Sequence, residues 1–92
     1  MTKADVINAI AAETGVSKTD VTASVEGFMA VIKRAMSEEK EDIFLRGFGT
    51  FVVKRRAEKL ARNISKNTSV VIPAHDFPTF KPAKTFVEQM NK

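Results

Sequence analysis

The sequence predicts an α+β fold in a single domain of 92 residues. Apolar residues recur at helical spacing in the first part of the chain, and the period then changes to that of β-strands. A strongly basic stretch with few large apolar residues interrupts the strands. We therefore expect a helical dimerisation base at 1–42, a small antiparallel sheet at 43–80 with a long protruding β-arm at about 54–70, and a short C-terminal helix at 81–92.

Two helices are expected in the base. Thr2 followed by Asp5 is typical of a helix start, because the hydroxyl caps a backbone N–H and the acid lies in the first turn. Gly15 supplies the stop. Ser17 followed by Asp20 repeats the start signal, and an apolar stripe of about five turns runs behind it. The short link between them predicts a helical hairpin.

Strands are expected after an acidic loop at 37–42. The segments 43–46 and 50–53 are rich in β-branched and aromatic residues, which is typical of strands. Between them, Gly47 and Gly49 fit a tight hairpin turn or a bulge that requires a positive φ. The sequence therefore predicts a β-hairpin as the start of the sheet.

The basic segment from Lys54 to Lys66 concentrates the charge of the chain. It holds six cations and one acid, a net charge of +5, whereas the whole chain carries only +4. Strand character resumes at 69–72, so the simplest topology is a two-stranded arm that turns near 65–67 and returns. Strand alternation places Lys54 and Arg56 on one face. A basic arm of this width favours a polyanionic partner and fits a DNA groove.

The aromatic residues are seven phenylalanines, with no tryptophan or tyrosine. A cofactor pocket or base stacking are alternatives, but the phenylalanines lie on apolar faces of the expected elements, which favours packing. A chain this short gives a flexing arm a poor anchor. A two-fold homodimer with one arm per subunit would provide a firmer base.

The composition offers little for catalysis. The chain lacks cysteine, a glycine-rich phosphate loop and any His and carboxylate spacing that suits a metal. His75 beside Asp76 is interpreted as a loop histidine between Pro73 and Pro78. We therefore expect no enzyme activity, catalytic residue, cofactor, metal or small-molecule substrate. No apolar run is long enough for a membrane span or a secretory signal, so a soluble cytoplasmic protein is expected.

Four motifs carry a resemblance to a known family. They are Gly47-Phe48-Gly49-Thr50-Phe51, Arg62-Asn63 in the arm, Ile72-Pro73-Ala74, and Phe80-Lys81-Pro82-Ala83-Lys84. With them the chain resembles, over nearly its entire length, the HU and integration host factor family of bacterial DNA-bending proteins, and it looks closer to HU. The resemblance implies an intertwined homodimer with a saddle-like sheet and two arms that embrace double-stranded DNA through the minor groove.

The resemblance also implies a function. It is histone-like, architectural DNA binding and bending with little sequence specificity, which compacts and stabilises the bacterial nucleoid. A sequence-preferring bending factor of the integration host factor type is an alternative, as is a heterodimer with a paralogue. An RNA-binding module or a protein–protein adaptor are alternatives from other classes, but RNA-binding sheets usually expose stacking aromatics, whereas these are expected to be buried.

The site residues follow by position. The implied DNA-binding set consists of cations of the arm and body with two arm-tip residues: Lys3, Arg46, Lys54, Arg55, Arg56, Lys59, Arg62, Asn63, Ile64, Lys66, Lys81 and Lys84. The implied aromatic dimer core consists of Phe28, Phe44, Phe48, Phe51 and Phe80.

The arm tip departs from the family. Where the family has Gly-Arg-Asn-Pro, this chain has Ala61-Arg62-Asn63-Ile64. The family's proline is a wedge that slips between base pairs and kinks the duplex. We expect Ile64 to serve as an apolar wedge in its place, and the alternative is a staple that packs against Leu60.

A second hypothesis concerns Lys3 and Glu26, which the family geometry would bring together. An ion pair there would hold Lys3 away from DNA until phosphate competes for it. Two independently solvated charges are the alternative, because exposed ion pairs are weak.

Overall fold

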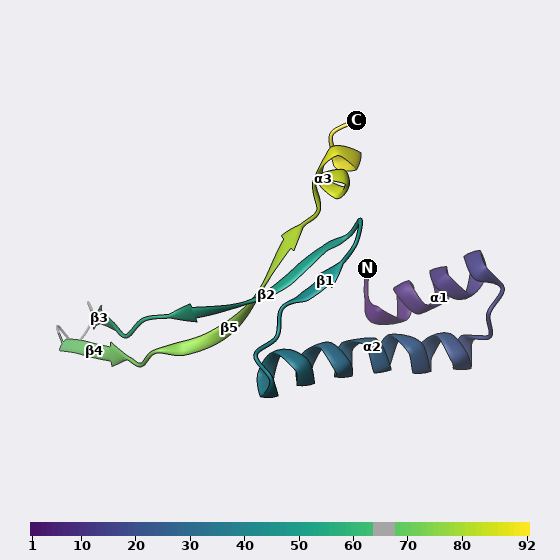
Figure 1. Cartoon of the computed structure of the whole chain (residues 1–92). Coiled ribbons are helices and arrows are strands. Elements are labelled where there is room, and N and C mark those ends of the chain that lie inside the picture. Colours follow the sequence, from purple (N-terminus) through teal and green to yellow (C-terminus); the bar gives the residue numbers. More distant parts are fainter. Residues whose placement is uncertain (64–67) are drawn as a thin grey trace.

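A computed structural model describes residues 1–63 and 68–92, with the side chains of 61–69 outside its description. In chain order its elements are α1 (Lys3–Thr14), α2 (Lys18–Glu38), β1 (Ile43–Leu45), β2 (Gly49–Arg56), β3 (Lys59–Asn63), β4 (Thr68–Ile72), β5 (His75–Pro82) and α3 (Lys84–Met90). Figure 1 shows α1 and α2 as a hairpin, the β3–β4 ribbon projecting from the sheet, and α3 at the far end of β5. The predicted α+β class is confirmed.

The caps of the first two helices lie where the sequence places them. Thr2 Oγ1 accepts a hydrogen bond from the backbone N–H of Asp5 at 3.3 Å, and Asp5 Oδ2 accepts one from Thr2 N–H at 2.9 Å. This capping box lowers the pKa of Asp5, chiefly through the backbone N–H of Thr2. Gly15 ends α1 with a φ of 75°, and Ser17 caps α2.

The acidic loop was expected at 37–42, but α2 continues to Glu38, so the predicted start of the loop is two residues too early. Ser37 and Glu38 are ordinary helical residues, and nothing ends the helix before Lys40, which has a left-handed φ of 55°. The connection to β1 is therefore the short segment 39–42.

The main sheet has the antiparallel strand order β1-β2-β5, and the arm is the antiparallel pair β3-β4. The interpretation of His75 as a loop residue is wrong, because His75 begins β5 and pairs with Arg56. Pro78 argued against a strand, since proline has no N–H. However, β5 is an edge strand, and Pro78 lies opposite Val53, whose N–H turns away to donate to Asp42 Oδ1 at 2.9 Å. No ladder hydrogen bond is lost at Pro78.

The two glycines of the first hairpin are required for different reasons. Gly47 has a φ of 80°, as the sequence predicts. Gly49 does not, but a Cβ built on it would lie 2.5 Å from the carbonyl oxygen of Lys81 and 2.5 Å from Phe80 Cζ. Gly49 therefore permits β5 and the Phe80 ring to lie directly against β2.

The chain buries little apolar surface on its own. Among the described residues, the buried apolar side chains are Ile7, Val21 and Met36. The radius of gyration is 18.6 Å, whereas about 12 Å is expected for a compact domain of this length. The fold therefore extends an arm and leaves apolar faces open.

We expect Gly49→Ala to destabilise the protein by about 1–3 kcal/mol, because the added methyl group must displace a backbone carbonyl or the Phe80 ring. Urea unfolding followed by circular dichroism measures this difference. Gly27→Ala is the control, since a Cβ at that helical position would have no atom within 4 Å apart from its chain neighbours and the backbone of its own helix. It should stabilise α2 by up to about 1 kcal/mol, and an equal loss in both variants would contradict the steric explanation.

Candidate nucleic-acid interface

The pairing of the strands gives the sheet two distinct faces. Residues directly opposite each other in an antiparallel pair share a face, and neighbours along a strand alternate. One face, here named the outer face, carries Phe44, Thr50, Val52, Lys54, Arg56, His75, Phe77, Thr79 and Lys81. The other, named the inner face, carries Ile43, Leu45, Phe51, Val53, Arg55, Asp76, Pro78 and Phe80. The inner face turns towards α2, because Asp76 bonds to Lys40 just after that helix.

The outer face is positively charged. Its cations Lys54, Arg56 and Lys81 are all exposed, and none of its residues is an acid. The sequence prediction that Lys54 and Arg56 share a face is confirmed by their cross-strand partners, Phe77 and His75. A surface of this kind attracts a polyanion with no like charge to repel it.

Arg56 is held by an aromatic ring. Its guanidinium lies 4.5 Å from the centre of the Phe77 ring, and His75 lies 6.2 Å from Phe77 between ring centres. His75 Nδ1 is 3.1 Å from the carbonyl oxygen of Pro73. Stacking on one face of the guanidinium leaves its N–H groups available to a phosphate. Phe77 was absent from the predicted site, because its position became clear only once β5 was known to be a strand.

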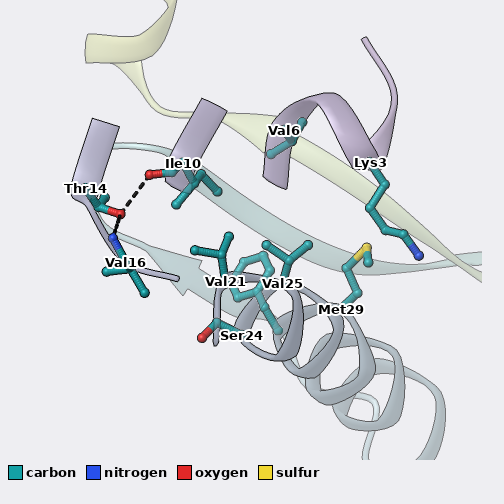
Figure 2. Close-up of a pocket in the computed structure, with 10 residues that line it drawn as sticks. Lys3, Val6, Ile10, Thr14, Val16, Val21, Ser24, Val25 and Met29 are labelled. Carbon is teal, nitrogen blue, oxygen red and sulfur yellow. Dashed lines mark hydrogen bonds between the residues drawn. The ribbon is translucent and has the colours of Figure 1, made fainter. Parts of the chain in front are cut away.

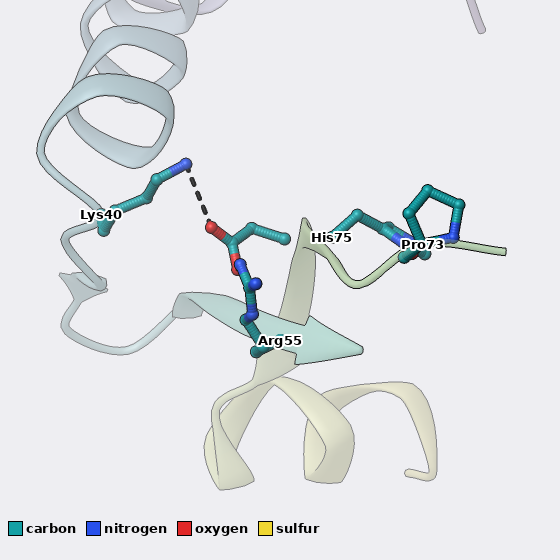
Figure 3. Close-up of polar contacts among 5 residues, drawn as sticks. Lys40, Arg55, Pro73 and His75 are labelled. Atoms are coloured by element: carbon teal, nitrogen blue, oxygen red, sulfur yellow. Dashed lines mark hydrogen bonds and ion pairs between the residues drawn. The ribbon is translucent and has the colours of Figure 1, made fainter. Parts of the chain in front are cut away.

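Arg55 does not join Lys54 and Arg56. It lies on the inner face, where its Nη1 is 3.2 Å from Asp76 Oδ1, and the other carboxylate oxygen of Asp76 is 3.2 Å from Lys40 Nζ (Figure 3). The two cations, Lys40 first and then Arg55, lower the pKa of Asp76. The sequence grouped all the cations of the basic segment together, and the structure separates this one.

The remaining arm residues are described in part. Lys59 is exposed and pairs with Ile72 at the start of the β3–β4 ribbon. Arg62 and Asn63 pair through their backbones with Ser69 and Thr68, but their side chains are outside the description. Ile64 and Lys66 lie outside the described residues altogether, together with the expected turn. The wedge at Ile64 therefore stays a prediction.

The four predicted cations of the body lie on four different segments of the chain. Lys3 begins α1 and forms an ion pair with Glu26 of α2, as the second sequence hypothesis anticipated. Arg46 is exposed in the turn that follows β1, and Lys84 is exposed at the start of α3. Lys81 alone of the body cations lies on the outer face.

The phenylalanines form a cluster, but not the predicted set. Ring centres are 5.1 Å apart for Phe48 and Phe80 and 5.0 Å apart for Phe51 and Phe80, while Phe86 stacks on Phe48 at 5.5 Å. Phe86 was missing from the predicted core, although its apolar neighbours in the C-terminal helix could have signalled it. Phe44 lies apart from this cluster, because strand alternation puts it on the outer face, where it is 79% exposed in the single chain. Its place in a dimer core stays a prediction.

Two apolar grooves border α2. The first has a volume of about 650 Å³ and lies between α1 and α2, where Val6 and Ile10 face Val25 across the gap (Figure 2). The second has a volume of about 700 Å³ and lies between α2 and the inner face of the sheet. Phe28, predicted for the dimer core, lines both grooves and is 48% exposed.

Other kinds of site find no support in the described part of the chain. There, no three His, Cys, Asp or Glu side chains gather closely enough to hold a metal ion. No described helix is both long enough and apolar enough to cross a membrane.

The fold is that of a small α+β protein. A helical hairpin carries an antiparallel sheet, and a basic two-stranded ribbon projects from that sheet. The family model for bacterial DNA-binding proteins matches residues 1–91. The chain therefore belongs to the bacterial DNA-binding protein family.

Individual relatives agree with this assignment. The chain is 34% identical over 92 residues to the DNA-binding protein HU of Thermus thermophilus, an alignment that covers 100% of this chain and 94% of the relative. It is 38% identical over 84 residues to the DNA-binding protein HU of Geobacillus stearothermophilus, covering 91% and 92%. A cocrystal structure of Anabaena HU with DNA matches with a TM-score of 0.90 and 30% identity, covering 98% of this chain and 97% of that one.

We expect Phe44→Ser to change the free energy of unfolding by less than about 0.5 kcal/mol, as is usual for exposed positions. Phe80→Ala should cost more than about 2 kcal/mol, because it removes the ring shared by Phe48 and Phe51. Thermal and urea unfolding of both variants measure the difference. A large loss for Phe44→Ser would place that ring in a buried core after all.

Proposed function

We propose that this protein binds double-stranded DNA through its outer face and its arm and bends the duplex with little sequence specificity. The observation that carries the proposal is the outer face itself, which presents Lys54, Arg56 and Lys81 without any acid and lies at the root of a basic ribbon. Relatives named for DNA binding, and the HU structure solved with DNA, support it. The role is that of an architectural binding protein and not of an enzyme.

The proposed affinity comes mainly from phosphates. Each Lys or Arg that replaces a condensed counterion releases it, so binding is strong at low salt and falls steeply as salt rises. Phosphate contacts position a protein on the duplex but carry no information about the bases. In the minor groove, a protein can distinguish little more than A·T from G·C pairs. An arm in that groove would therefore select DNA by its deformability, and bent or nicked duplexes should bind better.

The proposed unit is a homodimer. The two grooves beside α2 are lined mainly by apolar side chains, and the single chain leaves Phe28 and Phe48 about half exposed. A second copy related by a two-fold axis would cover these surfaces and place one arm on each side of the duplex. The domain division at 1–42, 43–80 and 81–92 fits this unit, with the helices as the base and the sheet and arm against DNA. A paralogous subunit with the same apolar surfaces could replace one half.

The proposed setting is the cytoplasmic nucleoid of a bacterium, where such dimers compact and stabilise DNA. The chain's membership in a bacterial family supports this setting. Competition experiments separate the two alternatives from the proposed function. Duplex RNA would be the best competitor for an RNA-binding module, and one preferred DNA sequence would be the best competitor for a sequence-preferring bending factor.

We expect Lys54→Gln and Lys81→Gln each to flatten the plot of log affinity against log salt by about one unit, because each removes one phosphate contact. The measurement is a salt titration on linear and pre-bent duplexes, with bending read in parallel by energy transfer. Arg34→Gln is the control, since Arg34 is exposed on α2, on the side of the sheet away from the outer face. Absence of duplex binding at physiological salt would refute the proposed function.

We expect Glu26→Gln to release Lys3 for phosphate binding. The two side chains are about half exposed, at 53% and 50%, and an exposed pair is worth less than about 1 kcal/mol, so DNA phosphate can compete for Lys3. The variant should steepen the salt dependence by about one unit and enlarge the DNA site. Glu13→Gln, on an exposed position of α1, is the control. Unaltered affinity and site size in Glu26→Gln would eliminate this role.

A further inference from the structure

Three consecutive cations at the root of the arm are not equivalent. Lys54 and Arg56 emerge on the outer face, whereas Arg55 emerges on the inner face opposite Asp76. All three are exposed, and strand alternation predicts from the sequence that Lys54 and Arg56 share a face, but not which residue faces Arg55. Strand register starts two of these side chains outward and one inward, and the partner of each side chain decides whether a long, flexible cation stays on its side.

Asp76 divides its two carboxylate oxygens between two parts of the molecule. Oδ1 contacts Nη1 of Arg55 on β2, and Oδ2 contacts Nζ of Lys40 after α2, each at 3.2 Å. The Asp76 side chain is only 23% exposed, whereas those of Arg55 and Lys40 are 67% and 53% exposed. The acid is thus the shielded centre of the network, with both of its oxygens occupied by cations.

A second contact joins the same two regions. Asp42 Oδ1 accepts the backbone N–H of Val53, so the segment 39–42 is bonded to β2 just before the arm root. Lys40, held by its left-handed backbone, reaches β5 from the same segment. The end of the long helix is therefore linked to both strands that continue towards the arm.

We propose that Asp76 is a positioning residue that sorts the cations of the arm root. It retains Arg55 as a structural cation that, with Lys40, fixes the arm root to the helical base, and it leaves Lys54 and Arg56 to contact DNA. This inference rests on the proposed function, and it removes Arg55 from the DNA-binding set implied by the sequence.

The physical reason is competition for a single cation. For Arg55 to reach a phosphate at the outer face, it must leave Asp76 and cross from the opposite side of a two-stranded ribbon. The departure would also leave Asp76 with Lys40 as its sole cation partner in this network. Arg56 faces no such competition, because the aromatic ring beneath it holds its guanidinium without neutralising the charge.

The experiment compares Arg55→Gln with its neighbour Arg56→Gln in two backgrounds, the full-length protein and the same protein carrying Asp76→Asn. Salt-titrated binding to one linear duplex is the readout. In the unmodified background, we expect Arg56→Gln to flatten the salt dependence by about one unit and Arg55→Gln to leave it unchanged. In the Asp76→Asn background, Arg55→Gln should also flatten it by about one unit, because Arg55 is then released to phosphate.

Two further variants separate positioning from simple folding. Asp76→Glu retains the carboxylate and should restore the unmodified salt dependence, while Lys40→Gln keeps Arg55 paired and should alter the bend, read by energy transfer, without altering the salt dependence. Equal flattening by Arg55→Gln and Arg56→Gln in the unmodified background overturns the inference, and this comparison does not require Asp76→Asn to fold. If the unmodified protein shows no salt-dependent duplex binding, the proposed function itself fails and the inference with it.

Discussion

The antiparallel pairing of β2 with β5 is the constraint on which the rest of the structure depends. It runs from Gly49 opposite Pro82 to Arg56 opposite His75, and it assigns every side chain of the arm root to one face or the other. A slip of one residue would turn Lys54 and Arg56 towards α2 and expose the phenylalanine cluster. The separation of an apolar side from a basic side is thus a consequence of register. Gly49 is required for this register, because only a residue without a side chain lets Phe80 and the β5 backbone lie so close to β2.

The same register gives the two sides of the sheet different surface properties. On the inner side, apolar grooves border α2 and the phenylalanines gather, which suits a second protein chain. On the outer side, exposed cations without acids suit a phosphate backbone. The acid opposite Arg55, Asp76, lies on the inner side, where it joins the base to the arm without weakening the outer charge.

Several elements followed from residues close together in sequence. The caps at Thr2 and Ser17 depend on groups three residues away, and the helix end at Gly15 depends on one backbone conformation. Because these features are local, they can be predicted without knowledge of the tertiary structure. β5 was missed for the opposite reason. The missing N–H of Pro78 argues against a strand until the sheet shows that Val53, opposite, directs its own N–H to Asp42. The face that Phe44 occupies also came only from the strand pairing, since apolar character does not say which face of a strand meets a core.

The sequence by itself determined the α+β class, the helical hairpin, the β-arm and its charge, because periodicity, caps and composition are local properties of the chain. Only the tertiary structure decided which of the arm-root cations are available and which is paired. Arg55 and Asp76 are 21 residues apart in the chain, and no local pattern brings them together. Their contact exists because β2 and β5 align in one register and the end of α2 delivers Lys40 to the same carboxylate.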